Sequence, residues 1–429
     1  MHDFTKANRA RYLLYFLLGS VLMLFTAFPY LQLIPSESYT QPFALMLGTF
    51  LFFPAGLKVF FSLARLDQIA LLGFALVGLG IFFATCFPYD NTQEYKYLVS
   101  YLTPILLTMP LLRYVKEYQG AAIKIIKFAI FFWIATAVIQ KLFDPNFLGF
   151  LIGQWSEAAL DIINSGRGVL SLAPEPTHHA FHILLLAACL ALLDSSGRSQ
   201  WILFLCILDA VLLAASSSAI LALMISAIAW SLFYRQRWFV IATLVIMFIA
   251  ILPLDEVMVQ VLRSTNSRIG TLIGDVLSEP TNILSLDYSM NVRLGGMAAV
   301  VYESFSSLLM PHGMSVVAWE TARNTLLADL PWLMDLSLGG PPSGMGQLLF
   351  QAGMFGVIFI ALSFRRILSP RVGQLGQILI MSSPIIFLSQ YYISTPTFSL
   401  LYACALFRLG HKCEFYTVRY NPYQSPLKT

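Results

Sequence analysis

The stretch from Ala173 to His182 gathers the residue types that carry acid–base chemistry. Glu175 stands directly before a proline, and His178 and His182 follow at intervals of three and four residues. Side chains at this spacing share one side of a helix, so we expect a carboxylate and two imidazoles at one helix end. Glu175 suits a general base, or a group that orients an acceptor hydroxyl. The alternative is that Glu175 only caps the helix, as carboxylates near first turns often do.

A metal at these residues is not expected. Two histidines at i and i+4 beside a carboxylate could ligate a metal, but the pattern is not HExxH and no clear fourth ligand stands nearby. The five cysteines show no CxxC or zinc spacing, which argues against a zinc site or a structural disulfide. The sequence therefore predicts chemistry without a bound metal.

An arginine precedes the same helix and indicates a site for an anion. Arg167 lies between two glycines, which would let a ligand approach the backbone, and Pro176 suits the first helical turn. The positive end of the helix dipole and its free N–H groups then face the preceding loop. A helix N-terminus with an arginine suits a phosphate or diphosphate. Alternatively, Arg167 is a solvated charge that answers Glu157 or Asp161.

A second stretch repeats these residue types. Ser289 or Asn291 can cap a helix that runs to about Leu309, which places Arg293 in its first turn. A cation there opposes the helix dipole, so a purely structural arginine is disfavoured. His312, held between Pro and Gly, is either a second proton-handling group or simply a turn residue.

Four more charged residues are candidates for binding or structural roles. Arg263 and Arg268 could bind sugar or phosphate, whereas Arg323 is interpreted as an ordinary loop charge. Asp209 lies in the middle of an apolar run, where a carboxylate is functional or paired. The serines at 216–218 could serve as its partners, and we interpret Asp209 as structural.

The elements that position these residues are membrane helices. Of the 429 residues, 58% are hydrophobic and only 11% are charged, against roughly 25% charged in a soluble domain. This composition excludes a soluble enzyme, a disordered chain and a disulfide-stapled secreted domain. A bilayer core needs roughly 17–25 apolar residues per helix. About twelve such helices are predicted, or eleven if two merge, near 12–30, 42–63, 69–88, 97–113, 127–143, 178–194, 201–216, 219–234, 238–254, 345–364, 375–390 and 397–409.

Loop charges predict the orientation. With cytoplasmic termini, 19 of the Lys and Arg residues fall on the inner side and 7 on the outer side, as the positive-inside rule requires. Residues 1–429 then form one membrane domain with two long periplasmic loops, 144–177 and 255–344. No nucleotide-binding motif is present, so any reaction must use a substrate activated beforehand. We expect no cofactor and no nucleic-acid partner.

The motifs resemble those of one family. Their order and loop placement, over roughly residues 145–360, are similar to bacterial O-antigen polymerases of the Wzy type, within the polymerase and O-antigen ligase superfamily. The matching motifs are Arg167-Gly168 with Glu175-Pro176, the helix start Ser216-Ser217-Ser218-Ala219, Arg293 with Pro311-His312-Gly313, and Ser343-Gly344-Met345-Gly346 with Gly353-Met354-Phe355-Gly356.

The resemblance implies an all-helical, GT-C-like glycosyltransferase of the bacterial inner membrane. Such enzymes join oligosaccharide units carried on undecaprenyl diphosphate at the periplasmic face, by an inverting displacement without metal or nucleotide sugar, for lipopolysaccharide or a related surface polysaccharide. It also implies a chain-length regulator in the same membrane as partner. By this resemblance Arg167 and Arg293 bind the diphosphates, Glu175 handles the acceptor, and His178 or His312 supports it.

Two other functions stay open. An O-antigen ligase would use the same chemistry but transfer the glycan to lipid A–core. A lipid-linked oligosaccharide flippase would suit twelve helices, but transporters are commonly built from internal repeats. Residues 1–215 and 216–429 show no such repeat, and only the second half carries the 255–344 loop.

Overall fold

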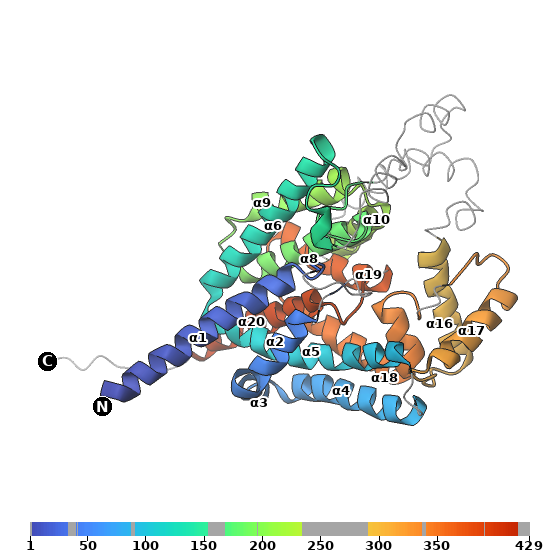
Figure 1. Ribbon diagram of the computed structural model, residues 1–429, viewed down its shortest axis with the longest axis horizontal. Coiled ribbons are helices and arrows are strands. Elements are labelled where there is room, and N and C mark those ends of the chain that lie inside the picture. The colour runs from blue at the N-terminus through green and yellow to red at the C-terminus, as the bar shows by residue number, and fades with distance from the viewer. Residues whose placement is uncertain are drawn as a thin grey trace.

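The described elements are all helices (Figure 1). A computed structural model describes residues 2–32, 40, 42–86, 91–152, 168–194, 196–233, 291–336, 340–389 and 391–418. In these residues seven helices are long and apolar enough to cross a membrane. They are α1 (His2–Ala27), the run α2 (Phe43–Leu51), η1 (Phe52–Gly56) and α3 (Leu57–Phe61), and α4 (Arg65–Thr85), α5 (Thr92–Glu117), α6 (Gln119–Leu142), α8 (Pro176–Leu193) and α18 (Gly344–Leu368).

The remaining helices are shorter or less apolar. They are η2 (Gly149–Ile152), α9 (Gln200–Leu208) with η3 (Asp209–Leu213), α10 (Ser217–Phe233), η5 (Asn291–Gly295) with α16 (Gly296–Ser306), α17 (Val316–Asp329), α19 (Gln374–Ser389) and α20 (Pro396–Val418). The predicted all-helical fold is confirmed. Eleven of the twelve predicted segments coincide with described helices, and the segment 238–254 lies outside the described residues. In the described part, seven helices are long and apolar enough to cross a membrane, so the count of twelve stays a prediction.

Helix α8 is the core of the bundle. Of its span, 94% is buried, against 28–67% for the other six long apolar helices. It packs against α6, α19 and α20, and lies at the centre of the group in Figure 1. A helix that is apolar all round is expected in such an interior position. The polar residues at the two ends of α8 are therefore held in place by closely packed neighbouring helices.

Helix α18, predicted as one unbroken helix, is interrupted at Gly353. The Gly353 backbone has φ +51°, and a Cβ there would lie 2.1 Å from the carbonyl oxygen of Leu309. The residues after α16 bond into the break: Met354 N–H donates to Leu309 O (2.9 Å), and His312 N–H donates to Phe350 O (3.0 Å). Non-helical backbone within an apolar helix needs such partners, and only glycine fits the conformation easily.

Contacts between helix ends support the predicted alternation of directions. Arg366 Nε lies 2.6 Å from Asp67 Oδ1, which joins the end of α18 to the start of α4. The Gln119 side chain donates to Leu193 O (2.8 Å), which joins the start of α6 to the end of α8. The predicted topology places all four of these helix ends on the same side of the membrane. The directions in which α4, α6, α8 and α18 run relative to one another therefore agree with that topology. Which side faces the cytoplasm stays a prediction.

Cysteine labelling tests the orientation. In a variant without other cysteines, Glu320→Cys should react with a membrane-impermeant thiol reagent in intact spheroplasts, because α17 belongs to the predicted periplasmic loop. Arg198→Cys, in an exposed turn on the opposite side, should react only after lysis. The reverse labelling pattern would show that the chain is inserted the other way round.

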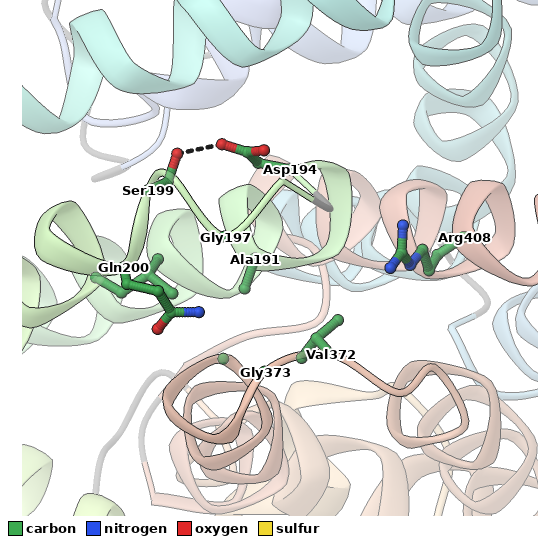
Figure 2. A pocket seen from close by; sticks show the side chains of 10 residues that line it. Ala191, Asp194, Gly197, Ser199, Gln200, Val372, Gly373 and Arg408 are labelled. Carbon is green, nitrogen blue, oxygen red and sulfur yellow. Dashed lines mark hydrogen bonds between the residues drawn. The ribbon is translucent and has the colours of Figure 1, made fainter.

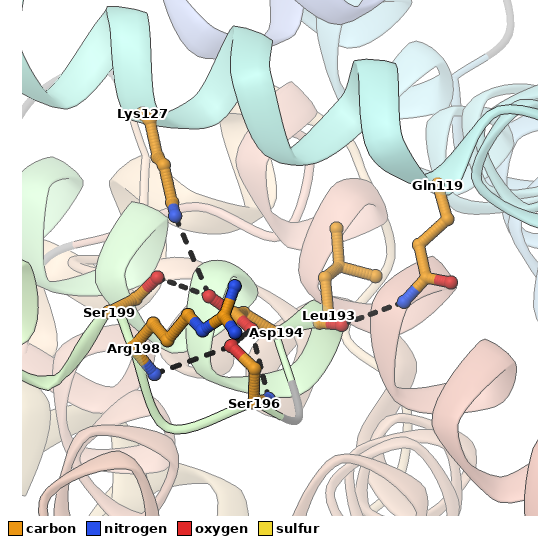
Figure 3. Close-up of polar contacts among 7 residues, drawn as sticks. All are labelled: Gln119, Lys127, Leu193, Asp194, Ser196, Arg198 and Ser199. Carbon is orange, nitrogen blue, oxygen red and sulfur yellow. Dashed lines mark hydrogen bonds and ion pairs between the residues drawn. The ribbon is translucent and has the colours of Figure 1, made fainter.

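A polar cluster closes the C-terminal end of α8 (Figure 3). Asp194 accepts hydrogen bonds from the Ser196 N–H (3.0 Å) and hydroxyl (2.6 Å) and from the Ser199 hydroxyl, and lies 3.5 Å from Lys127 Nζ. Burial by itself raises the pKa of Asp194, but these hydrogen bonds and the Lys127 charge lower it to about 2. Asp194 is therefore ionised at neutral pH and ties α6 to the turn after α8.

This cluster predicts an acid-dependent loss of stability. A carboxylate whose folded pKa lies below its ordinary 3.8 stabilises the fold above that value, and the contribution is lost as pH falls toward about 2. Asp194→Asn should therefore lower the melting temperature at pH 6, and the gap to wild type should shrink between pH 5 and pH 2.5. Thermal unfolding in detergent measures it, and a gap independent of pH would contradict the assignment.

Candidate active site

The segment before α8 is buried and fixes the position of Glu175. A Cβ on Gly168 would lie 2.0 Å from the carbonyl oxygen of Ala214, so the two backbones are in direct contact. Ser171 N–H donates to Gln140 Oε1 (2.6 Å), which ties the segment to α6. Gly168 thus serves close packing of the chain's own backbone, and not the approach of a ligand as predicted.

Glu175 occupies the N-cap position of α8, which begins at Pro176 as predicted. Its side chain makes no capping hydrogen bond, so the alternative role as a simple helix cap gains no support. The carboxylate is 40% exposed, and Oε2 lies 3.9 Å from Nδ1 of His178, whose side chain is 12% exposed. The structure therefore brings together the two residues that the spacing predicted to be neighbours.

A cleft of about 620 Å³ is lined by His178, whereas Glu175 reaches it only as the neighbour of His178 and is not itself among the lining residues. It is formed where the ends of α1, α5 and α8 meet the start of α18 and the connection between α19 and α20. The sequence places all these segments on the outer side. The lining is rich in hydroxyl, amide and aromatic groups, and includes Tyr30, Lys96, Tyr97, His178, Gln347 and Tyr391.

Two tyrosines flank His178 in the cleft. The Tyr30 ring meets it edge-on at 5.9 Å between centroids, and the Tyr391 ring lies at 6.3 Å. Burial raises the pKa of Tyr30, with Tyr391 and Glu175 adding to the effect. Burial also raises the pKa of Tyr391 to about 12, against the opposing hydrogen bonds of Thr397 and Tyr30. Both phenols therefore keep their protons at neutral pH, and their rings form part of the cleft wall.

His182 lies one turn deeper and is fully buried. Its Nε2 is 2.8 Å from the carbonyl oxygen of Ala27. A carbonyl oxygen only accepts, so Nε2 must donate, which leaves Nδ1 to face the hydroxyls of Tyr391 (3.1 Å) and Thr397 (3.2 Å). His182 therefore holds the Tyr391 hydroxyl in place beneath the cleft. Among the described residues, no group of three or more His, Cys, Asp or Glu side chains is placed to hold a metal ion.

The buried Asp209 has a partner that differs from the prediction. Its Oδ2 lies 2.8 Å from Nε2 of His179, and both side chains are almost fully buried. The serines at 216–218 were the candidate partners, but Ser216 accepts from Ala219 N–H (3.3 Å). Asp209 lies in the π-helical turn η3, packed against α8, so a histidine on α8 is the nearer group.

Three of the four predicted anion-binding arginines lie outside the described residues, and the fourth is described by its backbone alone. Arg167, Arg263 and Arg268 lie outside the described residues. Arg293 is described only by its backbone, which lies in η5. The helix predicted to begin at Ser289 or Asn291 begins with a π-helical turn before α16. The Asn291 side chain donates to Trp332 O and accepts from Met334 N–H, each at 2.8 Å.

The remaining candidates lie apart from the cleft or serve the fold. His312 stacks on Phe350 with ring centroids 4.5 Å apart, and its Nε2 lies 3.3 Å from Glu303 Oε1. It is not among the residues that line the cleft. Arg323, interpreted as a loop charge, lies in α17 and pairs with Asp335 at 2.9 Å, which corrects that interpretation.

Several residues of the cleft carry no motif in the sequence. Lys96 and Tyr97 come from the start of α5, Gln347 from α18, and Tyr391 from the connection before α20. The signals available were weak: Lys96 was one of few cations on the outer side, and Tyr391 belongs to a pair of tyrosines between two apolar runs. Only folding brings these segments together.

Comparison with known proteins found no protein-family model and no curated protein that matches this chain significantly. Function is therefore inferred from the cleft and from the sequence motifs.

Proposed function

We propose that this protein is a glycosyltransferase that polymerises oligosaccharide repeat units carried on undecaprenyl diphosphate. In this proposal the chain crosses the bacterial inner membrane about twelve times with both termini in the cytoplasm, and the cleft opens to the periplasm. The observation that carries the proposal is His178 in the wall of a large cleft of tyrosine, amide and lysine groups, with the Glu175 carboxylate 3.9 Å from its Nδ1. Tyrosines offer an apolar ring face and a hydroxyl together, which suits the faces and hydroxyls of sugars.

The chemistry needs a base and positive charge. An acceptor hydroxyl attacks the anomeric carbon of the donor sugar while the bond from that carbon to the diphosphate oxygen breaks, with inversion. Glu175 takes the hydroxyl proton, and His178, 3.9 Å away, orients the carboxylate. Lys96 in the cleft, with Arg167 and Arg293 as predicted, stabilises the charge that develops on the leaving diphosphate.

Disruption of the gene in its host tests this function and separates it from its alternatives. Loss of a polymerase should leave lipopolysaccharide, or the related surface glycan, capped with a single repeat unit. Bare lipid A–core would instead indicate a ligase, and accumulation of lipid-linked repeats on the cytoplasmic leaflet would indicate a flippase. Complementation with the wild-type chain, but not with Glu175→Gln, should restore the ladder of chain lengths.

A further inference from the structure

A second cavity lies at the opposite end of α8 from the cleft. It measures about 170 Å³ and is enclosed by the last turn of α8, the turn that leads into α9, and the start of α19 (Figure 2). Arg408 of α20 extends toward it from the right of the view, and Val372 and Gly373 lie below it. None of these residues belongs to the proposed active site.

One cationic side chain at this cavity, Arg408, lacks a hydrogen-bond acceptor among the described residues. The Nε of Arg408 is buried and has no hydrogen-bond partner among the described residues. Asp194 also lines the cavity, but its oxygens are already engaged by Ser196, Ser199 and Lys127 (Figure 3). An arginine keeps its charge at all relevant pH values, and although the Arg408 side chain is half-buried, its buried Nε is a donor left without an acceptor, which is costly. Arg408 is thus a cation whose counterion the described chain does not supply.

The facing wall adds hydrogen-bond donors without side-chain bulk. Gly373 and Gly376 stand at the start of α19, and both line the cavity. The first N–H groups of a helix have no intrahelical partner and carry the positive end of its dipole. A Cβ on Gly373 would lie 2.8 Å from Nε2 of Gln200, so this amide also reaches the wall. A guanidinium, an amide and a helix N-terminus around one small space are the donors that bind a phosphate group.

We propose that this cavity binds a phosphate group, with Arg408 as the principal ligand. The group belongs either to the head of an anionic phospholipid or to free phosphate. In the predicted topology this end of α8 meets the cytoplasmic leaflet, where basic pockets between membrane helices take anionic lipid head groups. The site is independent of the proposed glycosyl transfer, since it shares no residue with the cleft.

Binding of phosphatidylglycerol to the purified full-length protein tests the site. Native mass spectrometry of lipid titrations in detergent gives the dissociation constant, and inorganic phosphate serves as competitor. Arg408→Gln should weaken binding on the order of ten- to hundredfold, the loss expected for a charge-assisted contact. Arg198→Gln, on the same side but exposed and outside the lining, removes the same charge and should change binding less than about twofold.

Further variants keep the test decisive. Gly373→Val fills the cavity wall without changing charge and should weaken binding as Arg408→Gln does, and it replaces that variant if the latter does not fold. Displacement of the lipid by millimolar phosphate identifies free phosphate as a ligand, and lack of displacement identifies the lipid head group. The proposal is overturned if wild type binds neither ligand, or if Arg408→Gln and Gly373→Val both bind as tightly as wild type.

Discussion

Replacement of Glu175 by Gln is expected to reduce polymer formation by roughly 10²- to 10⁴-fold, the usual cost of a missing general base. The amide keeps the size of the side chain but cannot take a proton. Folding should be unaffected, because Glu175 makes no capping hydrogen bond with α8. The ladder of polymer lengths, compared at equal membrane abundance, measures the effect.

Glu303→Gln is the matched control. Glu303 also lies within reach of a histidine, with its Oε1 3.3 Å from His312 Nε2, but neither residue lines the cleft. A nearly normal ladder is expected from this variant. If Glu303→Gln abolishes the ladder and Glu175→Gln does not, the base belongs to the His312 pair and the proposed active site is wrong.

Arg293→Ala is expected to reduce the rate by roughly 10²–10³, or about 2.7–4 kcal/mol, the cost of one lost contact to a developing anion. Arg293→Lys should restore little of this loss, because an ammonium offers a point charge in place of the planar fork that matches a diphosphate. The same ladder assay, with donor concentration varied, separates an effect on turnover from an effect on binding.

Lys141→Ala provides the control for Arg293. Lys141 is an exposed cation at the predicted outer end of α6 and does not line the cleft, so its loss should leave the ladder unchanged. Arg323 is unsuitable, because it pairs with Asp335 and donates to Leu336 O (2.7 Å). A full ladder from Arg293→Ala would show that this arginine is structural.

Local patterns predicted the helices and the start of α8 well. An apolar run long enough to span a membrane forms a helix because its backbone groups must bond to one another. A proline such as Pro176 is favoured in the first turn of a helix, where its missing N–H costs nothing. The proximity of Glu175 and His178 follows from helical periodicity alone. These features need no knowledge of the rest of the chain.

Features that depend on distant segments were missed. The need of Asp209 for a partner was evident, but its contact with His179 depends on how η3 packs against α8. The break at Gly353 is stable only because the residues after α16 bond to the freed backbone groups. Lys96 and Tyr391 meet at one cleft because helix ends far apart in sequence converge, which neither periodicity nor spacing encodes.

Elongation by the purified protein tests the central claim most directly. The wild-type chain, reconstituted in liposomes with undecaprenyl-diphosphate-linked repeat units and no metal or nucleotide sugar, should convert single repeats into a ladder and release undecaprenyl diphosphate. Glu175→Gln in the same liposomes should leave single repeats. If the wild-type protein leaves the repeats unjoined, or moves them across the bilayer without joining them, the proposed function is wrong.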